Sequence, residues 1–375
     1  MDRYAGIPLS MLLAWFFRQK PGQGLPSPEF RRILVVKLAA LGDAVLLVPS
    51  LRALRKRYPR AEIVFLGTSL TESFLRQFPE YIDRFVVITI RSFLRPGYVL
   101  RFIRDVRSLA CDAAIDFEQW TRFVPLILAL ARIPVRVGFR VKRQFRHFLY
   151  THCKDRNPRV HEVDNFLSLA EVLGAADHSR ALEVKTDPAF VKDAEHELTT
   201  SGWDGKTALI VLHPGCGEHG FPREWPPSSY SEFASRISKN FKAFFVVSGT
   251  EQEVALLDQV RMEIGSSSTT FKISDPCRFV GMLSLASLFV SGNNGAMHLA
   301  AALRVPQVAL HGPTNPGQWG PLNLNATVVR SHCPLCPCLD LGSEYHRRDG
   351  YCMSQIPVAE VYQASLEILE AKTGR

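Results

Sequence analysis

The sequence predicts an α/β protein of two doubly wound parallel-sheet domains that face a cleft. Three observations lead to this fold class. The chain has 375 residues, more than one hydrophobic core usually supports. Short β-branched apolar runs alternate with stretches of helical periodicity, and this alternation runs through the chain twice. The composition, with 46% hydrophobic and 22% charged residues, is that of a globular protein and excludes a disordered one.

The first half opens with a strand at residues 33–36, whose continuous apolar run is typical of a strand buried on both faces. A glycine turn and a helix over residues 43–58 follow, and Pro59 ends that helix. The alternation then continues with strands expected at 62–66, 85–88 and 113–116 and helices at 70–77, 97–110 and 122–131.

The second half repeats the pattern. Strands are expected at 207–212, 243–247, 288–291 and 307–310, and helices at 228–239, 251–264, 279–286, 296–303 and, closing the chain, 358–371. The predicted organisation is an apolar segment and linker over 1–30, a first domain over 31–185 and a second over 186–375.

The N-terminal segment is apolar from Gly6 to Phe17, which is too short to span a bilayer. It lacks the strongly basic start and the cleavage site of a secretion signal. Two interpretations stay open: an interfacial anchor that inserts Trp15, Phe16 and Phe17 into lipid, or a helix packed on the protein's own surface.

The positive charge is concentrated in one region. The formal net charge is +9, and 16 Lys and Arg residues stand against five Asp and Glu between Arg84 and Arg159. Such a region implies a partner that carries phosphates or carboxylates, namely nucleic acid, a membrane surface or an anionic sugar-lipid.

Four short segments fall where predicted strands end, the edge at which doubly wound sheets bind ligands. The first, Lys37 to Ala44, lacks the GxGxxG of a dinucleotide site, which argues against a dehydrogenase. Gly42 allows a tight turn, and Asp43 lies at a helix start. Asp43 is either a functional carboxylate or an N-cap that satisfies backbone N–H groups.

The second and third segments follow strands of the second half. In the glycine- and proline-rich loop from His213 to Pro226, Arg223 and backbone N–H groups could hold a phosphate, although such an arginine is more often solvated. In the third segment, Glu251 or Glu253 could accept two ribose hydroxyls. The alternative is a pair of helix-start carboxylates favoured by the helix dipole.

The fourth segment, Ser291 to His298, combines a strand end, a glycine turn and a helix start. The helix N-terminus at Asn294, Gly295 and Ala296 would offer its N–H groups to a pyrophosphate. His298 is either a ligand contact or a satisfied structural histidine.

Four of the eight cysteines cluster near the end of the chain, at Cys333, Cys336, Cys338 and Cys352. Their spacing, C-x₂-C-x-C-x₁₃-C, could place four thiolates around a zinc ion. A second CxxC is missing, so reduced cysteines or a local disulfide are favoured over a metal.

These segments together resemble glycosyltransferase family 9, the bacterial lipopolysaccharide heptosyltransferases. The matching residues stand in family order: 33–37, Gly42-Asp43, 49–54, 213–215, 223–226, 292–303 and 311–314. Residues 161–164 and Cys352-Met353 match further family segments. The resemblance runs from about Arg32 to the last helix.

The resemblance implies a GT-B fold of two Rossmann-like domains and an inverting, metal-independent transfer of a heptose. The implied donor is a nucleotide-diphosphate sugar, typically ADP-heptose, and no other cofactor is required. Asp43 matches the family's general base, and Arg223 stands where the family places a cation, usually Lys, against the departing diphosphate. Glu251 or Glu253 would hold the ribose.

The resemblance also assigns Asn293 and His298 to the donor sugar. Asn293 is a departure, because the family usually has Asp there. The family enzyme is therefore weighed against two other classes: a sugar-nucleotide-binding homologue with little turnover, and an interaction protein at the inner membrane.

A basic, aromatic stretch from Arg132 to Arg146 lies in the first domain and suits a phosphorylated lipid A–Kdo acceptor, with Arg140, Lys142 and Arg143 as contacts. No RNA-binding signature accompanies it, so nucleic acid is not expected. The expected location is the cytoplasm, with peripheral contact at the inner membrane.

Overall fold

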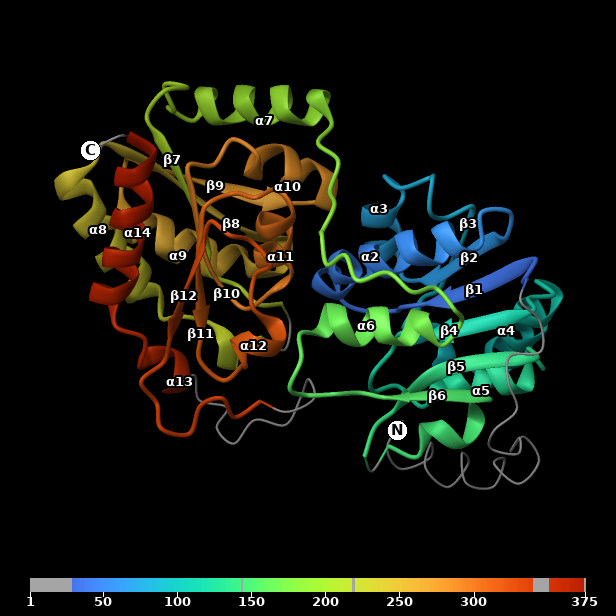
Figure 1. Ribbon diagram of the computed structural model, residues 1–375. Coiled ribbons are helices and arrows are strands. Elements are labelled where there is room, and N and C mark those ends of the chain that lie inside the picture. The colour runs from blue at the N-terminus through green and yellow to red at the C-terminus, as the bar shows by residue number, and fades with distance from the viewer. Residues whose placement is uncertain (1–28, 143, 218–219, 340–350, 374–375) are drawn as a thin grey trace. The chain divides into compact units, whose positions relative to one another are not determined.

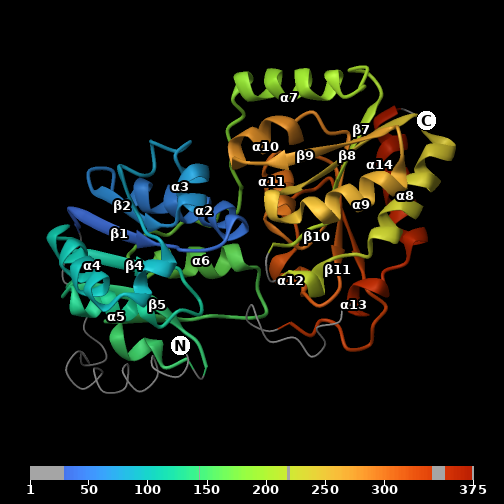
Figure 2. The same cartoon turned by 180° about the vertical axis from the view of Figure 1, so that it is seen from behind.

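The computed structural model describes residues 29–142, 144–217, 220–339 and 351–373. The chain divides into two compact units, of which the first ends at Arg180 and the second begins at Ala181. Each unit contains a parallel sheet with helices on both faces (Figures 1 and 2), which confirms the predicted fold class. The apolar segment before residue 29 and the side chain of Arg143 lie outside the described residues.

The first unit contains a six-stranded sheet, counted over the described residues, in the order β3-β2-β1-β4-β5-β6. Its strands are β1 (Arg32–Val36), β2 (Glu62–Gly67), β3 (Arg84–Val87), β4 (Ala113–Asp116), β5 (Val135–Arg140) and β6 (His152–Asp155), and all neighbours are parallel. Its helices are α2 (Leu41–Arg57), α3 (Ser69–Leu75), α4 (Pro96–Ser108), α5 (Phe123–Leu130) and α6 (Glu162–Glu171).

Side-chain alternation along the strands separates these helices into two layers. Leu34 and Val36 of β1 pack with Phe102 of α4 and Val124 of α5. The opposite face is covered by α2, which packs against α3 and α6. Burial of both faces explains why the strands read as continuous apolar runs.

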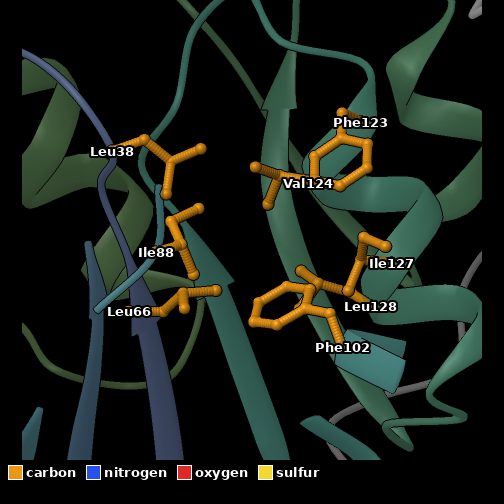
Figure 3. Close-up of a pocket in the computed structure, with 8 residues that line it drawn as sticks. All are labelled: Leu38, Leu66, Ile88, Phe102, Phe123, Val124, Ile127 and Leu128. Atoms are coloured by element: carbon orange, nitrogen blue, oxygen red, sulfur yellow. The ribbon is translucent and has the colours of Figure 1, made fainter. Parts of the chain in front are cut away.

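A small apolar cavity lies in the layer between this sheet and helices α4 and α5 (Figure 3). Leu38, Leu66, Ile88 and Phe102 contribute to its lining. Its volume is about 10 Å³, about enough for one water molecule. It is a packing gap of the core and has no room for a sugar.

The second unit contains a parallel sheet of six strands within the described residues, in the order β12-β11-β10-β7-β8-β9. Its strands are β7 (Ala208–His213), β8 (Ala243–Thr250), β9 (Ser268–Ile273), β10 (Leu288–Gly292), β11 (Gln307–His311) and β12 (Ala326–Arg330). The helices of eight or more residues are α7 (Pro188–Thr200), α8 (Pro227–Asn240), α9 (Val254–Ile264), α10 (Pro276–Leu283), α11 (Gly295–Ala302) and α14 (Val358–Thr373). Helix α8 packs against α9 and α14, and α10 against α7 and α11.

The two sheets have the same topology. Numbered from its own first strand, each has the order 3-2-1-4-5-6, whose direction reverses between the first and fourth strands. Ligands of doubly wound sheets bind at the carboxyl ends of those two strands. The topology therefore selects the turns after β1 and β4 in the first unit and those after β7 and β10 in the second.

Strands β5, β6, β9 and β12 and helices α6 and α7 are absent from the elements expected from sequence. The arginines of β5 interrupt the apolar pattern by which a buried strand is predicted. One of them, Arg136, is nevertheless buried and donates hydrogen bonds to the carbonyls of Leu149 and Ile133. Gly138 is required in β5, because a Cβ there would lie 2.2 Å from the Tyr150 ring. The stretch expected to contact an acceptor is thus partly a core strand.

None of the helices in the described part of the chain combines the length and apolar character needed to cross a bilayer.

Candidate active-site residues

Asp43 lies in the first turn of α2, next to the turn that follows β1. The N-cap of α2 is Ala40, and no side chain caps this helix end, so the N-cap interpretation of Asp43 is wrong. The Asp43 carboxylate instead pairs with the ammonium of Lys37, Nζ to Oδ2, at 2.7 Å. The Lys37 side chain is 1% exposed and that of Asp43 is 19% exposed, so the carboxylate keeps access to solvent.

Two residues after β4 complete the surroundings of Lys37. Its Nζ donates a hydrogen bond to Gln119 Oε1 at 2.8 Å and lies 3.4 Å from Glu118 Oε1. The same Glu118 oxygen accepts from the N–H of Leu38 at 2.7 Å. The pairing of β1 with β4 brings the two turns together, as the switch point requires.

A second buried ion pair supports this network. The Gln119 amide nitrogen donates to Glu162 Oε1 at 3.0 Å, and Arg156 binds both Glu162 oxygens at 3.0 and 2.6 Å. Glu162 begins α6, whose N-cap is His161. The segment 161–164 therefore contributes a buried carboxylate that orients Gln119.

The surroundings of Asp43 and Lys37 shift the pKa of both side chains. Burial raises the pKa of Asp43 above its ordinary value, the Lys37 ammonium opposes the rise, and the nearby carboxylates of Glu162 and Glu118 reinforce it. Burial lowers the pKa of Lys37, but the carboxylates of Asp43, Glu118 and Glu162 outweigh burial and raise it overall. A carboxylate with a raised pKa beside a permanent cation is the arrangement of a general base.

In the second unit, Arg223 ends the short helix η3 (Phe221–Arg223), in the loop after β7. Its guanidinium donates to the carbonyls of Asn293 and Cys216, at 3.1 and 3.2 Å. The guanidinium therefore spans the loops after β7 and β10. The Nε atom is buried and has no hydrogen-bond partner among the described residues.

The loop after β10 is fixed by two asparagines. Asn294 is the N-cap of α11: its Oδ1 accepts from the N–H of Met297 at 3.0 Å, and its Nδ2 donates to Gly215 O at 3.0 Å. Asn293 Nδ2 donates to Trp319 O at 2.8 Å, a bond that a carboxylate could not make. The N–H groups of Gly295 and Ala296 stand at the helix start, where no preceding turn supplies acceptors.

The structure gives the two candidate ribose carboxylates different environments. Glu253 closes a capping box: its Oε2 accepts from the N–H and hydroxyl of Thr250, both at 2.8 Å, and its Oε1 from Gly217 N–H at 3.0 Å. Burial acts to raise the pKa of Glu253, but these backbone hydrogen bonds outweigh burial and lower it. Glu251 is exposed and meets Lys272 at 3.5 Å, so the helix-start interpretation fits Glu253, and Glu251 is the accessible carboxylate.

Three buried histidines of the second unit belong to β7, β11 and α11. His298 is buried in α11. His213 and His311 end β7 and β11 and contact the hydroxyls of Ser248 and Thr314, each at 3.0 Å. Burial lowers the pKa of both His213 and His311 to about 4, so these rings are neutral at physiological pH.

Two of the three predicted acceptor contacts, Arg140 and Lys142, lie on the surface, and the third, Arg143, is outside the described residues. Arg140 ends β5 and pairs with Asp155 at 2.8 Å on the surface, and Lys142 is exposed. Arg146, at the end of the same basic stretch, is fully buried and binds Asp116 at 2.8 Å. The basic stretch is thus part core and part surface, and the contacts predicted at Arg140 and Lys142 lie on the exposed part.

The clustered cysteines converge in space. The sulfur of Cys352 lies 3.8 Å from those of both Cys333 and Cys338. No disulfide joins any two cysteines in the described part of the chain.

Comparisons with known proteins agree with this geometry. The sequence model of glycosyltransferase family 9 (heptosyltransferase) matches residues 99–347. The chain is 25% identical to lipopolysaccharide heptosyltransferase 2 of Salmonella typhimurium over 317 residues, covering 80% of this chain and 88% of that protein. The structure is similar to those of E. coli ADP-heptose lps heptosyltransferase II (TM-score 0.71, 20% identity, 91% of this chain and 99% of that one) and a family 9 glycosyltransferase from Veillonella parvula (TM-score 0.74, 19% identity, 92% and 98%).

Proposed function

This chain belongs to glycosyltransferase family 9 and is a glycosyltransferase, and on that premise we propose that it transfers a heptose, or a similar sugar, from an ADP-sugar to an anionic lipopolysaccharide-core acceptor of the lipid A–Kdo type. The transfer proceeds with inversion and needs no catalytic metal. The proposal draws on the named activities of the relatives and on the two sets of side chains at the sheet switch points.

The single observation that carries the proposal is the Asp43–Lys37 pair at the carboxyl end of β1. Asp43 takes the proton of an acceptor hydroxyl while that oxygen forms a bond to the anomeric carbon. The bond from the anomeric carbon to the diphosphate breaks on the opposite side, so the configuration inverts and the nucleoside diphosphate leaves. The raised pKa of Asp43 improves proton transfer, and Lys37 keeps the carboxylate ionised before the reaction.

On the donor side, Arg223 stabilises the negative charge that accumulates on the departing diphosphate. The N–H groups of Gly295 and Ala296 offer further donors, because the positive end of α11 favours a phosphate. Glu251 accepts the ribose hydroxyls, and Asn293 and His298 border the donor sugar. Every group in this scheme belongs to the protein or its two substrates.

The acceptor is anionic, and the proposed location is the cytoplasmic face of the inner membrane, reached by peripheral contact. The support for this is the excess of Lys and Arg in the first unit. Nucleic acid plays no part in the proposal.

The decisive experiment is transfer by the Asp43→Asn variant, with Asp105→Asn on exposed α4 as the matched control. Asp43→Asn should lower turnover by roughly two to four orders of magnitude, the usual effect of losing a general base, while ADP affinity stays within about twofold because Asp43 lies in the first unit. Near wild-type turnover in Asp43→Asn would remove Asp43 from the mechanism.

A donor comparison tests the substrate class. Thermal shifts with ADP-, UDP- and GDP-sugars should be largest for the ADP-sugar. The alternative, a sugar-nucleotide-binding homologue with little turnover, predicts the same thermal shifts but no transfer. Asn293 does not favour that alternative, because its amide has a structural partner in Trp319.

A further inference from the structure

The four clustered cysteines occupy a segment without regular secondary structure between β12 and the closing helices. Residues 331–339 contain no helix or strand, and the short helix α13 (Tyr351–Ser354) carries Cys352. Cys333, Cys338 and Cys352 are 4, 6 and 3% exposed. They form a buried cluster of their own, against which, within the described residues, the partly buried Cys336 packs. Leucine, isoleucine and phenylalanine side chains, the usual material of a packed core, are absent from this described cluster.

The sulfur positions match a tetrahedral metal site. Zinc binds thiolate sulfur at about 2.3 Å, and a tetrahedron of such bonds separates its sulfurs by about 3.8 Å. The Cys352 sulfur lies 3.8 Å from that of Cys333 and 3.8 Å from that of Cys338. The sulfurs of Cys333, Cys336 and Cys352 all lie within 4.8 Å of one another. Cys333, Cys336 and Cys352 thus form a compact group of three sulfurs, and Cys338 adjoins this group through Cys352.

The backbone brings these side chains together before any ion binds. The N–H of Cys336 donates to Cys333 O at 3.0 Å, which closes the tight turn of a Cys-x₂-Cys pair. The N–H groups of Cys338 and Leu339 both donate to Pro313 O, at 2.9 and 2.8 Å. One Cys-x₂-Cys turn and a backbone tie to Pro313 thus hold Cys333, Cys336 and Cys338 in place, and the Cys-x₂-Cys spacing is one that structural zinc sites use.

From these distances we infer that Cys333, Cys336, Cys338 and Cys352 bind one structural, thiophilic metal ion, zinc or a single iron. Each thiol releases its proton to solvent as its sulfur binds the ion, giving a four-thiolate, tetrahedral site. The ion fastens the segment after β12 to α13 and, through Pro313, to the loop that follows β11. This role is structural and is independent of the proposed transfer reaction. It therefore agrees with a transfer that needs no catalytic metal.

The primary test is metal analysis of the full chain purified in reductant without chelators. About one equivalent of zinc or iron is expected, because a four-thiolate site retains its ion under mild conditions. Cys338→Ser and Cys352→Ser should each reduce the metal content at least tenfold, whereas the control Cys277→Ser, outside the cluster, should leave it unchanged. Elemental analysis distinguishes the two ions, and an iron-loaded protein would turn red on oxidation to Fe³⁺ whereas a zinc-loaded one would stay colourless.

A second measurement covers variants that fail to fold. The wild-type chain is unfolded in denaturant with chelator, refolded with Co²⁺, and examined by visible absorption. Intense tetrahedral d–d bands with sulfur-to-cobalt charge transfer are expected. Metal below about a tenth of an equivalent, together with a weak octahedral cobalt spectrum or none, would overturn the inference and leave four thiols packed without an ion.

Discussion

At the scale of single residues, the chemistry depends on how neighbouring groups change one another's protonation. Asp43 is a short carboxylate at a helix start, a position common to many structural residues. Its partner Lys37 and the acids around that lysine distinguish it. This combination of partial solvent access and a fixed cation suits the general-base role proposed for Asp43.

Replacing Lys37 with Met should move the acid limb of the turnover profile to higher pH. The cation that opposes the rise in the pKa of Asp43 is lost, so Asp43 becomes protonated at a higher pH. A protonated Asp43 cannot act as a base, so turnover falls as the pH drops through the pKa of Asp43. Since that pKa is higher in the variant, the variant loses turnover at a higher pH than wild type and recovers it when the pH is raised. The profile of kcat against pH is the measurement, with donor KM as the control. An unshifted acid limb would exclude electrostatic control of Asp43 by Lys37.

Replacing Arg223 with Ala should weaken ADP binding by about 1.5–3 kcal/mol, the scale of a hydrogen bond to a charged group. Calorimetry with ADP measures this, and Arg223→Lys, which keeps the charge but loses the second donor, should fall between wild type and Ala. Arg236→Ala on exposed α8 serves as the control. Equal ADP affinity in the Ala variant and wild type would return Arg223 to a purely structural role between the loops after β7 and β10.

At the scale of elements, helix α4 presents an unusual surface. Arg101, Arg104 and Arg107 are exposed on it, and Leu100 is 66% exposed. The opposite side of the helix buries Phe102 against the sheet. Exposed arginines next to an exposed leucine match the interface of an anionic bilayer, where the charges meet headgroups and the apolar side chain enters the lipid.

Changing the three α4 arginines to Gln should reduce binding to vesicles that contain anionic lipid. Each Lys or Arg near such a surface contributes about 1 kcal/mol, so the triple change should weaken binding by roughly a hundredfold. The matched control changes Lys192, Lys206 and Lys239, exposed lysines of the second unit, to Gln. Flotation or co-sedimentation with neutral and anionic vesicles measures both. An equal loss in the two variants would point to net charge rather than to α4.

At the scale of the whole molecule, charge and chemistry are divided between the two units. The region between Arg84 and Arg159, with its excess of basic residues, lies in the first unit together with Asp43. Arg223 and the start of α11 lie in the second. Under the proposed function, the anionic acceptor binds to the first unit and the nucleotide to the second.

Raising the salt concentration should therefore raise the acceptor KM and leave the donor KM nearly constant. Exposed charges are screened beyond about 10 Å at 0.1 M salt, whereas a diphosphate held by a half-buried guanidinium and backbone N–H groups is screened much less. Steady-state kinetics from low to moderate salt, with each substrate varied in turn, gives both constants. If the donor KM rises while the acceptor KM stays constant, the assignment of the two units is reversed.

The sequence by itself determined the alternation of strands and helices, the two-domain organisation it implies, and the four segments at strand ends. These features depend on local patterns, because apolar periodicity and turn residues can be recognised within a short stretch of neighbouring residues. Asp43 and Arg223 belong to those segments, but the resemblance to family 9, rather than the local pattern, singled them out. Strand β5 could not be predicted from the local pattern. The sequence does not distinguish Arg136, which is buried and donates to backbone carbonyls, from an arginine on the surface.

Only the tertiary structure decided which residues surround those two. Glu118 and Gln119 reach Lys37 because β4 pairs with β1. Glu251 and Glu253 lie at the same helix start in the sequence, but only the structure shows that Glu253 closes a capping box and that Glu251 stays accessible. The convergence of the four cysteine sulfurs likewise depends on α13 folding back onto the segment after β12. Contacts between residues far apart in the chain are set by strand pairing and packing, and these are properties of the whole fold rather than of any local pattern.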